Sequence, residues 1–164
     1  MDIQSADQHK TTVKVSLTQA AEVRHQLDAM TRAIRAGRLP EITSFYSQAI
    51  VAYDMMPPFK FTDLNSYRQT AWKDCFIEVF QFPVSYEYRE DQLFVTDEYA
   101  IRTGEVHMSG VFKKNSQRVE NRLRNTTVLQ KMDGEWKIIH EHNSVPIGRD
   151  MKALMNLKPE LQMH

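Results

Sequence analysis

The stretch DGEWKIIHEHNSVP, residues 133–146, is the part of the chain that indicates the fold most directly. It opens on Asp-Gly, a dipeptide typical of the two-residue turn of a β-hairpin. The residues that follow predict a strand over 135–144. Because side chains alternate along a strand, one face is expected to carry Trp136, Ile138, His140, His142 and Ser144. The two histidines would then point the same way, about 7 Å apart by a rise of ~3.3 Å per residue.

The histidine pair leaves three interpretations open. A metal site needs at least one more ligand, such as His107 or Glu105 from a neighbouring strand. His140 and His142 are followed by Asn, Ser, Val and Pro, with no further acidic ligand on the strand, so we expect no metal. The remaining interpretations are imidazoles hydrogen-bonded within the sheet or at an interface, and the wall of a binding pocket.

Upstream of this stretch the sequence changes from helical to strand-like character. A helix is predicted by the apolar stripe Ala20, Val23, Leu27, Met30 and Ile34, with Ser16 and Gln19 as a capping box and Gly37 at its end.

Two further helices and the first strand follow. Pro40 begins a short second helix that includes Ile42, Phe45 and Tyr46, and Thr62 or Asp63 caps a third that carries Trp72. A first strand is predicted at 49–53, before two prolines that cannot continue a ladder.

Four more strands are predicted at 84–90, 93–108, 118–131 and 135–144, with turns at Glu90-Asp91, Asn115-Ser116 and Asp133-Gly134. Helices first and an antiparallel meander afterwards is an α+β order. The expected architecture is a cone in which N-terminal helices pack on a strongly curved antiparallel sheet, as in a cystatin-like roll.

The composition and charge of the chain limit the classes of binding partner that we expect. The 164 residues suffice for one domain, and 21 basic residues balance 21 acidic ones. Nucleic acid or an anionic membrane is therefore not expected as a partner. The sequence has no apolar run long enough to span a bilayer and no signal core at its start. We expect a cytoplasmic protein in which the single cysteine, Cys75, is a packed thiol.

Two arginines lie within apolar strands, where a guanidinium normally needs an anion. Arg102 belongs to YAIRTGEVH, residues 99–107, and Arg124 to RLRNTTV, residues 122–128. One interpretation is a cross-strand ion pair with Glu98, Glu105 or Glu120 on the solvent face. The other is an anion-binding site inside the cone that combines one arginine with a histidine.

The end of the first strand offers a candidate acid or base. Asp54 is either a general base in an apolar mouth or the cap of a turn. Tyr53, Trp72 and Tyr86 are candidate pocket walls, although aromatic residues at such positions are also typical of a core.

These residues resemble the nuclear transport factor 2-like superfamily, in its SnoaL-like and ketosteroid isomerase-like branch, close to the calcium/calmodulin-dependent protein kinase II association domain. The matching terminal pattern is Asp133, Gly134, Trp136, His140, His142, Ser144 and Pro146. YAIRTGEV resembles the strand that supplies a pocket arginine, VAYDMMPP resembles the first-strand segment, and Thr126 matches a threonine before the last turn. The resemblance covers about residues 17–147. It implies a cone fold, a homodimer through the open sheet face, and a cavity that some members use for isomerisation, cyclisation or dehydration without metal or cofactor.

The expectation is therefore a disordered arm at 1–15, a SnoaL-like domain at 16–147 and an extension at 148–164 that is either a short helix or a frayed tail. The domain would bind a small apolar or anionic ligand, and an enzymatic version would be a metal-independent lyase or isomerase without cofactor. The candidate catalytic residues are Asp54 and His142, and the candidate ligand-binding residues are Tyr53, Trp72, Tyr86, Arg102, Arg124 and His140. The alternative is a non-catalytic oligomerisation module.

Overall fold

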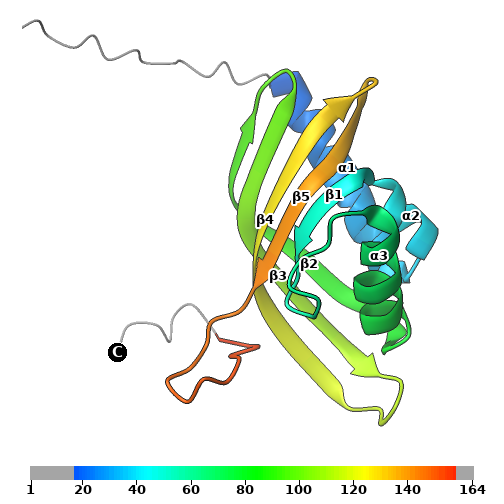
Figure 1. Ribbon diagram of the computed structural model, residues 1–164, viewed down its shortest axis with the longest axis vertical. Coiled ribbons are helices and arrows are strands. Elements are labelled where there is room, and N and C mark those ends of the chain that lie inside the picture. Colours follow the sequence, from blue (N-terminus) through cyan, green and yellow to red (C-terminus); the bar gives the residue numbers. More distant parts are fainter. Residues whose placement is uncertain (1–16, 158–164) are drawn as a thin grey trace, which may run out of the picture.

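The computed structural model describes residues 17–157, in which helices precede a curved sheet of five strands (Figure 1). The helical elements are α1 (Leu17–Ala36), α2 (Leu39–Ser44), α3 (Leu64–Tyr67) and its π-helical continuation η1 (Arg68–Ile77). The strands are β1 (Tyr46–Tyr53), β2 (Phe80–Val95), β3 (Tyr99–Phe112), β4 (Arg118–Met132) and β5 (Glu135–Ser144). The predicted α+β cone is confirmed.

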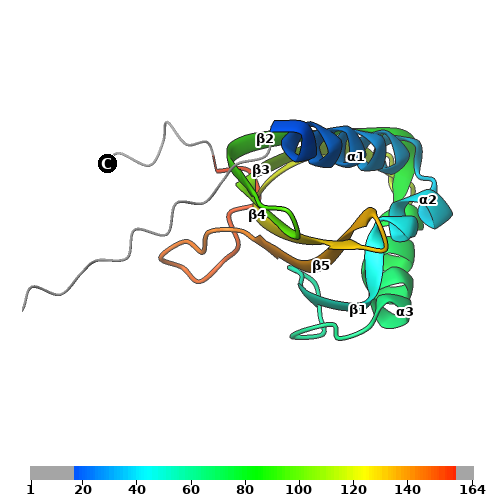
Figure 2. The same ribbon diagram turned by 90° about the horizontal axis from the view of Figure 1, so that it is seen from above.

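The sheet has the order β1-β5-β4-β3-β2, with β1 parallel to β5 and the other neighbours antiparallel. Figure 2 shows the sheet curling, with α1 beside β2 and α3 beside β1. The predicted turn at Asp133-Gly134 is confirmed, because both residues have positive φ and connect β4 to β5. The helices and the concave face of the sheet therefore enclose the interior of the cone.

The predicted turn at Glu90-Asp91 is wrong. β2 runs through this polar segment as an edge strand, with a register shift against β3 between Glu90 and Gln92. The chain reverses later, at Thr96–Glu98, where the Thr96 hydroxyl accepts hydrogen bonds from the backbone N–H groups of Glu98 and Tyr99. A bulge can absorb the polar residues because an edge strand has only one pairing partner.

A second bulge, in β5, has the larger consequence for function. Leu129 pairs with Ile138 while the preceding Val128 pairs with His140, so Ile139 is an extra residue on β5. A bulge reverses the alternation beyond it. Trp136 and Ile138 share one face, as predicted, and this face points into the cone, but Glu141 follows them there instead of the histidines. The prediction that His140 and His142 share the face of Trp136 is therefore wrong.

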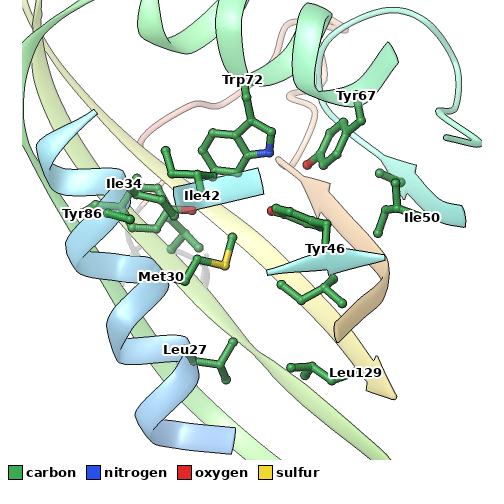
Figure 3. Close-up of a cluster of buried hydrophobic side chains, with 14 of the residues drawn as sticks. Leu27, Met30, Ile34, Ile42, Tyr46, Ile50, Tyr67, Trp72, Tyr86 and Leu129 are labelled. Carbon is green, nitrogen blue, oxygen red and sulfur yellow. The ribbon is translucent and has the colours of Figure 1, made fainter. Parts of the chain in front are cut away.

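The helices follow their apolar stripes. In α1 the buried residues include all five positions of the predicted stripe, and the helix ends at Gly37, whose φ is +70°. Asp63 caps α3 by accepting a 2.8 Å hydrogen bond from Ser66 N–H. Pro40 lies in the first turn of α2 as predicted, whereas Tyr46 begins β1. Figure 3 shows the resulting core, in which Met30 and Ile34 of α1 face aromatic side chains from β1, α3 and η1.

The chain beyond β5 has no helix over residues 145–157. Ile147 forms a bridge with Ala153, and Arg122 N–H donates a 2.7 Å hydrogen bond to the Met155 carbonyl. The C-terminal segment thus lies against β4 beyond the end of β5. The predicted arm at 1–15, the capping residue Ser16 and residues 158–164 lie outside the described residues. Between Leu17 and Leu157 no helix has both the length and the apolar character needed to cross a membrane.

Candidate functional site

A cavity of about 420 Å³ lies between η1 and the concave face of the sheet. This volume falls within the range of roughly 300–1,000 Å³ typical of small-molecule sites. Its walls are mainly apolar and include Ala71, Trp72, Phe76, Phe80, Tyr86, Met108, Phe112 and Leu123. Its acidic side chains are Asp54, Asp74 and Glu141, and Met155 of the C-terminal segment completes the lining.

Glu141 is the buried carboxyl of this cavity, with an exposed fraction of 2%. Its Oε2 accepts hydrogen bonds from the Tyr46 hydroxyl at 2.6 Å and the Tyr67 hydroxyl at 3.3 Å, and its Oε1 accepts one from Asn125 Nδ2 at 3.2 Å. Burial raises the pKa of the Glu141 carboxyl above its ordinary value of 4.5; the charge of Asp54 adds to the rise and the Tyr46 hydrogen bond opposes it. A raised pKa lets this carboxyl keep its proton to a higher pH than an exposed glutamate does.

Asp54 lies half-buried at the end of β1 and is linked to Glu141 through a shared tyrosine. Its Oδ2 lies 3.4 Å from the Tyr67 hydroxyl, while its Oδ1 accepts a 3.2 Å hydrogen bond from Met56 N–H. Asp54 therefore caps the turn, which is one of the two interpretations, and it also lines the cavity, while its role as a general base stays a prediction. Burial raises the pKa of the Tyr67 hydroxyl well above 10, which keeps it protonated as a donor between two carboxyl groups.

Arg102 points into the cone and is 3% exposed. Its Nη2 donates to Asn125 Oδ1 at 2.6 Å and to Thr127 Oγ1 at 3.1 Å, and its guanidinium lies 3.5 Å from the centre of the Tyr88 ring. Its partners are thus an amide, a hydroxyl and a ring. This arrangement is neither the cross-strand ion pair on the solvent face nor the anion-binding site that the two interpretations describe. Asn125 joins this network to Glu141.

The predicted site residues fall into two groups. Trp72 and Tyr86 line the cavity together with Asp54. Tyr53, His140 and His142 form a separate aromatic group, with the Tyr53 ring centre 5.3 Å from His140 and 5.6 Å from His142.

The second group lies away from the cavity. The His140 ring also bonds through Nδ1 to the Val51 carbonyl at 2.8 Å. Tyr53 and His142 line a second, more open pocket of about 700 Å³ along the 54–59 loop, which shares Asp54 with the cavity. Arg124 is exposed on the outer face of the sheet, opposite Glu105 and Ser144. The structure therefore does not bring Arg102, Arg124 and the histidines together.

The sequence interpretation missed Glu141 and Tyr46. Strict alternation assigned Glu141 to the outer face, and Tyr46 was placed in the second helix. The local sequence carries no signal for Glu141, because β5 (EWKIIHEHNS) has charged and polar residues on either side of it. Within residues 17–157 no three His, Cys, Asp or Glu side chains are arranged so that they could hold a metal ion.

The α+β cone matches the nuclear transport factor 2-like fold. The pattern of the SnoaL-like domain matches residues 23–148, most of the chain. The chain belongs to the SnoaL-like domain family.

Solved structures agree with this assignment. A nuclear transport factor 2-like protein of unknown function from Pseudomonas putida KT2440 is 25% identical with a TM-score of 0.75, over 89% of this chain and 100% of that one. A ketosteroid isomerase-like protein from Erwinia carotovora atroseptica is 14% identical with a TM-score of 0.67, over 79% and 97%. The association domain of the Caenorhabditis elegans kinase CaMKII is 12% identical with a TM-score of 0.62, over 78% and 96%. No curated protein matches the chain.

Proposed function

We propose that this SnoaL-like protein is an enzyme that moves a proton on a small, mainly apolar carbonyl compound bound in the cone. The observation that carries the proposal is Glu141, a fully buried carboxyl that lines an apolar cavity and is connected through the Tyr67 hydroxyl to Asp54. Two carboxyl groups in unlike environments are the arrangement that acid–base catalysis uses. The similarity to a ketosteroid isomerase-like protein supports the same reaction class.

The roles follow from the positions of the two carboxyl groups. Asp54 is half-buried at the mouth, where it accepts only weak hydrogen bonds, and is the proposed base that takes a proton from the carbon beside the carbonyl. Glu141 is the proposed proton reservoir, because burial raises the pKa of its carboxyl. The Tyr67 hydroxyl lies 3.4 Å from one carboxyl and 3.3 Å from the other and would connect them. The proton returns to another carbon of the same molecule, so the net reaction is an isomerisation.

The experiment uses 2-tetralone, an apolar ketone with acidic protons beside its carbonyl. Nuclear magnetic resonance in D₂O measures the exchange of those protons with and without the protein. We expect exchange faster than in buffer, and at least about 100-fold less acceleration by Asp54→Asn, since general bases contribute roughly 10²–10⁴-fold.

The matched control is Asp74→Asn, which removes an equal charge from the lining of the same cavity. Asp74 accepts a hydrogen bond from Gln69, whereas the Tyr67 hydroxyl bonds to Asp54 and Glu141, so this variant should retain the acceleration. If both variants lost the acceleration equally, Asp54 would contribute only its negative charge and would not be the base. No acceleration by the wild-type protein would contradict the proposed reaction.

A second proposal, assembly with another copy of the chain, is favoured by exposed apolar residues on the outer face of the sheet. Phe94, Tyr99 and Ile101 are 51%, 42% and 41% exposed, and Phe94 pairs with Ile101 across β2 and β3. The similarity to an association domain supports assembly as well. Ultracentrifugation should show a dimer that Ile101→Lys dissociates, and a wild-type monomer at high concentration would contradict it.

A further inference from the structure

The indole N–H of Trp72 has no hydrogen-bond acceptor within the described part of the chain. Trp72 is 8% exposed and lines the cavity of the cone. Burying such a donor without a partner costs free energy, and buried donors are therefore nearly always paired. An unpaired donor in the wall of a cavity indicates an acceptor that is supplied from outside the chain.

The surroundings of Trp72 fix where this donor points. Its ring centre lies 6.2 Å from that of Tyr46, 6.4 Å from that of Tyr67 and 5.6 Å from that of Phe76. Figure 3 shows the indole nitrogen on the side of the ring that faces the hydroxyl groups of Tyr67 and Tyr46. Aromatic packing on several sides restricts rotation of the indole, so the N–H is held on the side of the Tyr67 and Tyr46 hydroxyls.

Trp136, the other tryptophan, shows that the fold can satisfy a buried indole. Trp136 is 3% exposed, and its Nε1 donates to Glu22 Oε2 at 3.3 Å. The two indoles are thus buried to a similar extent, and only the one that lines the cavity lacks an acceptor among the described residues.

We infer that the Trp72 N–H binds the oxygen of the ligand and selects neutral carbonyl compounds over hydrocarbons and over anions. The inference deepens the proposed function and rests on it, because it assumes a ligand in the same cavity. An indole N–H only donates, so its partner must be an acceptor.

The carboxyl groups of the cavity set the charge of this ligand. Asp54 and Asp74 line the same space, so a carboxylate ligand would meet like charges. Both Glu141 oxygens already accept hydrogen bonds, from Asn125, Tyr46 and Tyr67. The Tyr46 and Tyr67 hydroxyls are thus already engaged, whereas the Trp72 N–H has no acceptor among the described residues and would stabilise the negative charge that develops on a ligand oxygen during proton removal.

The test compares 2-tetralone with tetralin, the hydrocarbon of the same ring system without the oxygen. Calorimetry with the wild-type protein should give about tenfold tighter binding of the ketone, the size expected for one buried hydrogen bond. Trp72→Phe keeps an aromatic ring and removes the N–H, so it should bind the two probes within about twofold of each other. Trp136→Phe is the matched control and should keep the preference of the wild type.

A measurement on the unaltered protein guards against a variant that does not fold. The indole N–H signals of the two tryptophans are resolved by ¹⁵N-edited nuclear magnetic resonance. We expect 2-tetralone to move the Trp72 signal downfield and tetralin to leave its proton shift nearly unchanged.

The outcomes separate this inference from the proposal on which it rests. If both probes bind and Trp72→Phe keeps the preference for the ketone, the inference is overturned while the cavity stands. If neither probe binds the wild-type protein, the proposed site fails and the inference fails with it.

Discussion

Arg102 and Trp72 are both buried inside the cone, but they differ in whether their hydrogen-bond donors have partners. The Arg102 guanidinium is bonded to Asn125 and Thr127 and lies against the Tyr88 ring, and Thr127 donates to Asn125 in turn. At Trp72 the indole N–H has no acceptor among the described residues. Polar groups that satisfy one another stabilise the wall of the cone, whereas the unpaired N–H of a residue that lines the cavity is the basis of the inferred ligand contact.

The largest effect on stability is expected at Arg102. Arg102→Ala removes donors from the buried Asn125 and Thr127 oxygens and leaves a cavity beside Tyr88. We expect the free energy of unfolding to fall by about 3 kcal/mol in urea denaturation. Arg124→Ala on the exposed outer face should change it by less than about 0.5 kcal/mol. Similar losses in the two variants would contradict a structural role for the Arg102 network.

A smaller difference is expected between the two tyrosines that bond Glu141. Tyr46→Phe removes a 2.6 Å hydrogen bond to the buried carboxyl and should cost about 2 kcal/mol. Tyr67→Phe removes contacts of 3.3 and 3.4 Å and should cost less than about 1 kcal/mol. Both tyrosines are buried and lose the same atom, so urea denaturation compares the hydrogen bonds directly. A larger cost at Tyr67 would show that its hydroxyl is structural.

The third prediction concerns the pH dependence of stability. Burial raises the pKa of the Glu141 carboxyl above 4.5 in the folded protein, so folding favours its protonated form. Its contribution to stability is present below the unfolded pKa and is lost as the pH rises through the folded one. Relative to Glu141→Gln, the wild type should lose roughly 1.4 kcal/mol for each unit between those two pKa values.

The comparison with Glu141→Gln depends on how the free energy of unfolding varies with pH in the wild type and in the variant. The introduced side chain would place an amide near Asn125 Nδ2 or near the tyrosine hydroxyls, which adds an offset that does not vary with pH. Denaturation across roughly pH 4–8 checks the expectation, and parallel curves would show that the pKa of Glu141 is the same in the folded and unfolded states.

Much of the fold could be predicted because the spacing of apolar residues along the sequence indicates which side chains are buried. The stripe of α1, the Asp63 cap and the Asp133-Gly134 turn each follow from local residue types. The turn at Glu90-Asp91 could not be judged in this way, because polar residues in an edge strand resemble those in a loop.

The site was less predictable, because one extra residue in β5 determines which side chains face the cavity. The bulge at Ile139 exchanges the two faces of β5, and nothing in the local sequence distinguishes this bulge from regular alternation. Asp54, Trp72 and Tyr86 were predicted as candidates and do line the cavity, since they lie before or away from the bulge. Glu141 lies just beyond it, and its place depends on the pairing of β5 with β4 across the hairpin and with β1, which is far away in the sequence.

A crystal structure of the protein soaked with 2-tetralone tests most directly whether the cone is a binding site for carbonyl compounds. We predict density for the ketone between Trp72 and Tyr86, with its oxygen within hydrogen-bond distance of Trp72 Nε1 and its acidic carbon facing Asp54. A cone filled by its own side chains, or a ketone bound only outside the cavity, would contradict both the proposed reaction and the role of Trp72.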